Sequence, residues 1–122
     1  MNPDQVPADE FAALVAAQFS ALPEWVRQAV QEVAILTEDA PPPGTAPEHG
    51  LLLGQYRGVP LPRRGHRASG SLPDTIVLYR EPIARVCRRA ADLPERARQV
   101  LLHEIGHALG LDEKRLRELG VG

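Results

Sequence analysis

A predicted helix over residues 94–109, near the end of this 122-residue chain, carries two histidines and a glutamate among aliphatic side chains. His103 and His107 are four residues apart, so both imidazoles project from one side of the helix, with Cβ atoms about 5–6 Å apart. Glu104 follows His103 directly. Aliphatic residues make the rest of the helix apolar nearly all round, which implies that neighbouring elements bury most of it. Because buried imidazoles and carboxylates are costly without partners, the fold must supply a partner, and a metal ion would be one.

The residues after this helix offer a further ligand. Gly110 lies three residues after His107, and a glycine there can take a positive φ and turn the chain back. The turn brings either Asp112 or Glu113 towards the histidines, and the other of the two would cap the last helix. Two imidazoles and one carboxylate leave the fourth tetrahedral position of zinc to water, and Glu104 could act on that water as a general base. The alternative is chance, since a pattern of three fixed positions also arises in proteins whose histidines are ordinary core or surface residues.

Length and composition restrict the remaining possibilities. The chain is short enough to form a single domain over residues 1–122, with residues 1–8 expected to be a flexible N-terminus. The N-terminal segment is too acidic and too polar for a signal peptide, and no apolar run reaches the roughly 20 residues that span a bilayer. Cys87 is the only cysteine, which excludes an intramolecular disulfide. These features predict a cytoplasmic protein that does not enter membranes.

Charge is distributed unevenly along the chain. Residues 1–50 hold eight Asp or Glu against Arg27 alone, whereas residues 51–100 hold ten Arg against four acids. The simplest interpretation is that the acidic first half packs against the basic second half. Nucleic-acid binding is the alternative, and it would use the cationic set Arg57, Arg63, Arg64, His66 and Arg67. That stretch lacks interleaved aromatic residues and the overall pI is about 6.1, so we expect no nucleic-acid partner.

The spacing of apolar residues and the positions of proline and glycine predict a mixture of helices and strands. Helices are expected over 9–22, from Pro23 to Val30, over 82–89, over 94–109 and over 112–119, and strands over 33–36 and 74–80. Asp92 and Glu95 fit an N-cap and capping box for the helix at 94–109. Residues 40–50 and 60–73 are rich in proline and glycine and indicate loops. The segment 51–59 fits either a strand or a turn.

Several other residues are assigned to structure rather than chemistry. Trp25 is predicted to anchor the core, and Cys87 to be a small buried hydrophobe. His49 and His66 lie in the proline- and glycine-rich segments and are expected to be solvated.

Three segments together resemble a known family. Leu51 to Leu61, Leu72 to Arg80 and Val100 to Leu111 are similar to the bacterial minimal zincins, small proteins described as zincin-like or as zinc metallopeptidases, and the resemblance spans residues 9–119. It implies an α+β fold in which a small β-sheet packs against the active-site helix, flanked by N-terminal and C-terminal helices, and it implies a homodimer. It also favours Glu113 over Asp112 as the third zinc ligand beside His103 and His107, because metzincins place their third ligand at that spacing.

The resemblance further implies hydrolysis of peptides or unfolded proteins, with Glu104 as the general base. The strand before the active-site helix would offer its edge to an extended, antiparallel substrate, through Ile76, Val77, Leu78 and Tyr79. Donors for the oxyanion would come from Tyr79, Tyr56, His66 or the arginines between 63 and 67.

One departure from the family pattern leaves a second function open. Metzincins support the zinc with a methionine turn, and Met1 is the only methionine here. A catalytically weak or inactive zincin-fold binding or regulatory module is therefore the alternative. The intact Glu104 favours hydrolysis, because a pure binding module has no need of a general base.

Overall fold

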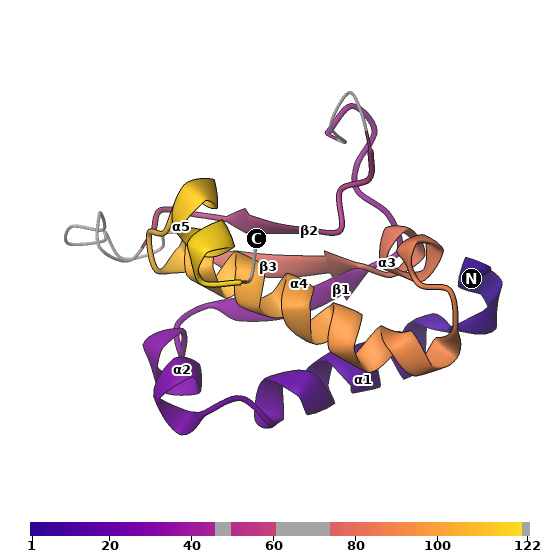
Figure 1. The fold of residues 1–122 in the computed structure, drawn as a ribbon, viewed down its shortest axis with the longest axis horizontal. Helices are drawn as coiled ribbons and strands as arrows, with labels where there is room; N and C mark the ends of the chain where they lie inside the picture. The colour runs from indigo at the N-terminus through magenta and orange to yellow at the C-terminus, as the bar shows by residue number, and fades with distance from the viewer. Residues whose placement is uncertain (46–49, 61–73, 121–122) are drawn as a thin grey trace.

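The computed structural model describes residues 1–45, 50–60 and 74–120. Within them the chain forms a two-layer α+β domain around a three-stranded sheet, as predicted (Figure 1). The strands are β1 (Ala34–Glu38), β2 (Gly54–Arg57) and β3 (Thr75–Tyr79), arranged in the order β1-β3-β2. β3 is the central strand: it runs parallel to β1 and antiparallel to β2.

Two long helices cover one face of the sheet. α1 (Ala8–Ser20) and α4 (Leu93–Ala108) lie side by side against it, and α4 crosses in front of β3 (Figure 1). The core between the layers is almost entirely aliphatic. It combines Phe11 and Val15 from α1 with Ile76 and Leu78 from β3 and Leu101 from α4, all nearly inaccessible to solvent. Burial of this apolar surface is the main force that holds α4 to the sheet.

Shorter helices complete the domain. α2 (Glu24–Ala29) follows α1, α3 (Arg80–Val86) follows β3 directly, and α5 (Glu113–Glu118) lies over the C-terminal end of α4 (Figure 1). Two single-turn 3₁₀ helices, η1 (Pro3–Gln5) and η3 (Ala90–Asp92), precede α1 and α4. None of the described helices is both long and apolar enough to cross a membrane.

The helices differ from the sequence-based expectations at three places. Trp25 is 68% exposed, so its prediction as a core anchor is wrong; on α2 it is Val26 that faces inwards. α3 begins at Arg80 and ends at Val86, because Pro82 fits the first turn of a helix. Asp92 does not cap α4: its carboxylate accepts a hydrogen bond from the Arg89 amide at 3.1 Å and closes η3 instead.

The structure also shows which elements form in the segment 51–59 and in the N-terminal residues. The segment 51–59, which fits either a strand or a turn, contains β2, which pairs with β3 through Gly54 to Arg57. Residues 1–8, expected to be flexible, contain η1 and the buried side chain of Val6. Arg80 connects this segment to α3, since its guanidinium donates to the carbonyl oxygens of Pro3 and Val6 at 2.8 and 3.0 Å.

Candidate metal centre

The turn after α4 sets the position of the third candidate ligand. Gly110 has a φ of +88°, as its place after His107 predicted. Its amide donates to the His107 carbonyl at 2.9 Å, and the Leu111 amide donates to the Gly106 carbonyl at 2.9 Å. These two bonds form a Schellman motif, which satisfies the last carbonyls of α4 and reverses the chain. α5 therefore starts back over the face of α4 that carries the two histidines.

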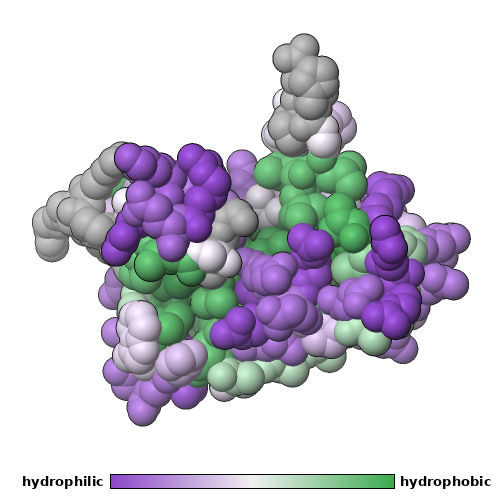
Figure 2. Space-filling view, in the orientation of Figure 1, coloured by the Kyte–Doolittle hydropathy of each residue, from purple (hydrophilic) through white to green (hydrophobic). Residues whose placement is uncertain are grey.

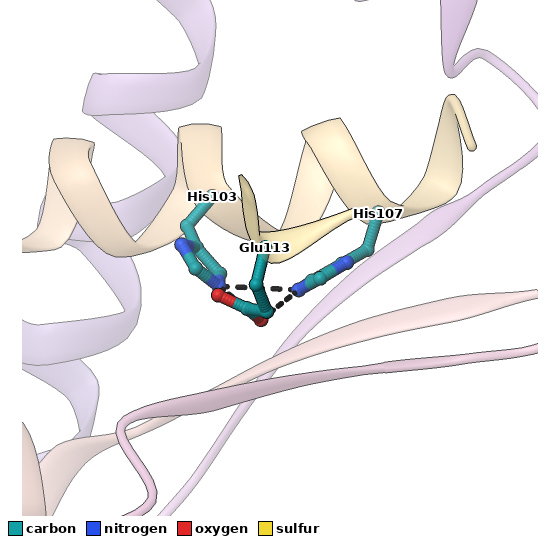
Figure 3. A group of neighbouring side chains, drawn as sticks. All are labelled: His103, His107 and Glu113. Carbon is teal, nitrogen blue, oxygen red and sulfur yellow. Dashed lines mark hydrogen bonds and ion pairs between the residues drawn. The ribbon is translucent and has the colours of Figure 1, made fainter. Parts of the chain in front are cut away.

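His103, His107 and Glu113 converge at this point (Figure 3). The two Nε2 atoms of the histidines are 3.1 Å apart. Oε1 of Glu113 lies 2.8 Å from Nε2 of His107 and 3.2 Å from Nε2 of His103. Asp112, the alternative ligand, instead caps α5, because its Oδ1 accepts a hydrogen bond from the Arg115 amide at 2.8 Å. Of the two adjacent acids, the structure brings Glu113 to the histidines.

The hydrogen bond at Nδ1 of His107 leaves its Nε2 atom facing the cluster. Its Nδ1 lies 3.1 Å from the Leu111 carbonyl oxygen, which can only accept, so Nδ1 carries the hydrogen. Its Nε2 then faces the Glu113 carboxylate at 2.8 Å, where either a second proton on the ring or a cation would lie between the two atoms. Tetrahedral zinc, with ligands at roughly 2.0–2.1 Å, would hold its ligand atoms about 3.4 Å apart. The cluster would have to open by only a few tenths of an ångström.

Electrostatics around Glu113 favour its ionised form. Burial raises the pKa of this carboxyl, but the neighbouring charge of His103 and hydrogen bonds from His107 and His103 together hold the pKa below its ordinary value. An ionised carboxylate beside two imidazoles is a donor set that zinc accepts.

Glu104 lies on the same helix, but its environment is different. It is only 7% exposed, and it lines the cleft beside His103 and His107. Burial raises the pKa of its carboxyl. The charges of His103 and His107 and a hydrogen bond from the backbone of Tyr56 lower this pKa, but the effect of burial is larger. Glu104 is therefore held next to the cluster without joining it, as a general base would be.

The cluster opens into a cleft between α4 and β2. A pocket of about 530 Å³ is bordered by β2 on one side and by the histidines and the start of α5 on the other. Gly54 makes the close approach of β2 possible, because a Cβ there would lie 2.8 Å from Cγ1 of Val100 and 3.3 Å from Cγ of Glu104. A glycine inside a strand is the sequence signal that could have indicated this approach.

The prediction of a substrate-binding edge on the strand at 74–80 is wrong. Ile76, Val77, Leu78 and Tyr79 belong to the central strand β3, which is paired on both sides, and all four side chains are fully buried. The edge that borders the cleft belongs to β2. The Tyr79 amide donates to the Leu53 carbonyl, and Gln55 pairs with Val77.

The alternation of an antiparallel ladder then fixes which groups of β2 face outwards. The backbone N–H and C=O groups of residues 53, 55 and 57 point towards β3, so those of Gly54 and Tyr56 point away from it. The Tyr56 backbone uses this direction to reach Glu104. Sequence reasoning left this segment as either a strand or a turn, because it shows no clear alternation.

The candidate oxyanion donors separate into two groups. The Tyr79 hydroxyl accepts from Arg57 at 2.9 Å and donates to Gln55 at 3.0 Å, and it does not line the cleft. Tyr56 lines the cleft, but its hydroxyl donates to the buried carboxylate of Asp74 at 2.7 Å. His66, the arginines between 63 and 67, and His49 lie outside the described residues.

Cys87 is buried, as predicted, and burial raises the pKa of its thiol.

Comparisons with known proteins identify the family and support the fold. None of the curated proteins searched matches the chain. A conserved hypothetical protein from Thermus thermophilus has a similar solved structure, with a TM-score of 0.57 and 24% identity, over 93% of this chain and 97% of that one. This likeness supports the fold alone. The sequence profile of the zincin-like metallopeptidases matches residues 30–122, which include the whole sheet, α4 and α5. The chain is therefore a member of the zincin-like metallopeptidase family.

Proposed function

We propose that the protein is a zinc-dependent peptidase in which His103, His107 and Glu113 hold the metal and Glu104 is the general base. The observation that carries this proposal is the convergence of three ligand atoms at 2.8–3.2 Å beside a buried glutamate, inside a cleft. Zinc, when bound, supplies Lewis acidity and lowers the pKa of water. Membership of the zincin-like metallopeptidase family supports the same chemistry.

Residues of the chain would transfer the proton and orient a metal ligand. Glu104 takes a proton from the attacking water, whose oxygen forms the new bond to the carbonyl carbon of the scissile peptide. As the carbon–nitrogen bond breaks, the same carboxyl delivers that proton to the leaving amine nitrogen. The hydrogen bond from Nδ1 of His107 to the Leu111 carbonyl keeps the imidazole in the tautomer and orientation that a ligand needs.

The substrate would be an extended peptide laid against β2. The backbone groups of Gly54 and the carbonyl group of Tyr56 point away from β3 and can extend the ladder to an added strand, which is the mechanism of β-augmentation. The Tyr56 amide is already bonded to Glu104. Antiparallel pairing is the arrangement expected for such a substrate. β2 thus takes the role that the resemblance to the minimal zincins implied for residues 76–79.

The proposal is tested by zinc content and hydrolysis measured on the same samples. After dialysis against trace zinc, we expect one zinc per chain in the wild type and in Glu104→Gln, and none in His107→Ala. Hydrolysis of a mixed peptide substrate should fall at least a hundredfold in Glu104→Gln. Hydrolysis that survives this substitution would contradict the mechanism.

A different result would favour the second function. Stoichiometric zinc in the wild type without any hydrolysis, in a peptide set of broad composition, would identify a zincin-fold binding module. Absence of zinc from every sample would reject both the metal site and the peptidase.

A further inference from the structure

A second pocket continues the cleft along α4. It has a volume of about 350 Å³ and shares Leu52, Gly54, His103 and Glu104 with the first pocket. It extends towards the N-terminal half of α4, where Val100, Gln99 and Arg96 line it. The two pockets thus form one groove, and the candidate metal ligands lie near its middle.

The lining of this second pocket is apolar close to the metal centre. Leu52 and Leu53 precede β2, and Val100 is one helical turn before Glu104. Figure 2 shows apolar surface over the segment that leads into β2, next to the polar surface of the helices. Such a lining favours an aliphatic side chain of a bound peptide.

Charge differs between the two ends of the groove. Asp112 lines one end, whereas Arg96 is the one arginine or lysine among the described residues that line either pocket. No ion pair joins Arg96 to an acid within residues 1–45, 50–60 and 74–120. Arg96 hydrogen-bonds to the Cys87 thiol and also lines a neighbouring pocket that contains Asp92 and Glu95. A carboxylate in the groove is therefore attracted to the Arg96 end and repelled from the Asp112 end.

The direction of β2 determines which part of a peptide meets this end. A peptide antiparallel to β2 runs from the Arg57 side towards Leu52, so the residues after the scissile bond lie over the second pocket. Arg96 is seven residues before His103, about 10.5 Å along the helix axis. At about 3.3 Å per residue of extended chain, this distance corresponds to roughly three peptide residues.

We propose that the groove selects peptides with an aliphatic side chain directly after the scissile bond, held by Leu52, Leu53 and Val100, and with a carboxylate about three residues after that bond, paired with Arg96. The proposal rests on the proposed peptidase function for the position of the scissile bond. The carboxylate can belong to an acidic side chain or to the C-terminus of the peptide, and these two sources give different products. A side chain permits cleavage within a longer chain, whereas a terminal carboxylate restricts cleavage to peptide ends.

Direct binding tests the proposal without requiring hydrolysis. The protein is zinc-loaded Glu104→Gln, and the probe is fluorescein-labelled Ala-Gly-Ala-Ala-Leu-Ala-Glu-Ala-amide, measured by fluorescence anisotropy. Replacing the Glu of the probe by Lys should weaken binding about fivefold or more, as the loss of one charge pair predicts. Adding Arg96→Gln should abolish this difference, whereas Arg98→Gln, an exposed control on the same helix that is paired with Glu95, should preserve it. Equal binding of the Glu and Lys probes, or an unchanged difference in Arg96→Gln, would overturn the assignment of Arg96.

Two further comparisons complete the test. A probe that ends Leu-Ala-Ala with a free carboxylate, compared with its amide, shows whether the C-terminus can replace the acidic side chain. Leu52→Ser should reduce the preference for Leu over Ser in the probe, and Leu51→Ser should not, because Leu51 lines neither pocket. Hydrolysis by the wild type is scored separately. Selective binding without hydrolysis would reject the peptidase function but keep the groove, and hydrolysis without selectivity would reject only the groove.

Discussion

Asp112 and Glu113 are adjacent acids with separate tasks. The Asp112 side chain accepts a hydrogen bond from the Arg115 amide and caps the N-terminus of α5, so it contributes to the stability of that helix. Glu113 is the first residue of the helix, and its carboxylate faces the two histidines rather than the backbone. Sequence spacing leaves the two acids as alternatives, because either can be reached from Gly110. Their hydrogen bonds distinguish them.

This division predicts opposite effects of two substitutions. Asp112→Ala should lower the free energy of unfolding by about 1 kcal/mol, the usual contribution of an N-cap, and weaken zinc binding only slightly. Glu113→Ala should leave stability without zinc within about 0.5 kcal/mol of the wild type, and weaken zinc binding by at least tenfold. Urea denaturation in the presence of a chelator and calorimetric zinc titration measure the two quantities. A larger loss of zinc affinity in Asp112→Ala would assign the ligand to Asp112.

Cys87 provides a residue-scale test of burial. Its side chain is almost inaccessible, and burial raises the pKa of the thiol despite the opposing effect of Arg96. Because only the thiolate reacts readily, the native protein should react with a disulfide reagent at pH 8 at least a hundred times more slowly than the urea-unfolded protein. Equal rates would show that the end of α3 opens readily.

The packing of α5 on α4 determines the position of one candidate metal ligand. A Cβ on Gly106 would lie 2.2 Å from Cδ2 of Leu116, which is fully buried and has little room to move. Gly106 therefore allows α5 to lie directly on α4. The same packing fixes Glu113, three residues before Leu116, at its distance from the histidines.

Gly106→Ala should consequently affect both stability and metal binding. We expect a loss of about 1–3 kcal/mol in the free energy of unfolding, as for other overpacked cores, together with at least tenfold weaker zinc binding. Gly106→Ala combined with Leu116→Ala removes the clash and should recover part of the zinc affinity, although the smaller core costs stability. No recovery in the double variant would mean that the position of α5 does not control the ligand.

Elements that depend on nearby residues were predictable from the sequence. The approach of an acid to His103 and His107 involves eleven consecutive residues, in which helical periodicity and one positive-φ glycine bring either Asp112 or Glu113 towards the histidines. β3 was also predictable, because its β-branched and aromatic residues lie between two prolines. In each case the signal and its consequence lie within the same short segment.

Elements that depend on distant partners were not predictable. The resemblance to the minimal zincins implied that β3 offers a free edge, and the pairing of β2, whose segment shows no clear alternation, makes β3 central. The size of Trp25 favours a core position, but α2 is a six-residue helix that turns Val26 inwards instead. The groove follows neither from spacing nor from composition, since it needs β2 to approach α4 at Gly54.

At the scale of the whole molecule, the candidate metal ligands join a central element to a terminal one. α4 is held in the core by its packing against α1 and the sheet, whereas α5 packs on α4 through one fully buried side chain, Leu116. A metal held by His103, His107 and Glu113 would tie these two helices together. Since the unfolded chain cannot present the three ligands in this arrangement, zinc should bind the native state far more tightly and stabilise it.

The size of this stabilisation can be predicted. At a free zinc concentration one hundred times the dissociation constant, the free energy of unfolding should rise by about 2.7 kcal/mol, which corresponds to a Tm increase of roughly 10 °C for a domain of this size. A chelator should reverse the increase. Glu104→Gln should retain it, because Glu104 is not among the three converging ligands, and His107→Ala should lose it. An equal increase in His107→Ala would place the zinc at other residues and would remove the basis for the proposed peptidase, whereas its selective loss would show that these ligands form the metal centre in solution.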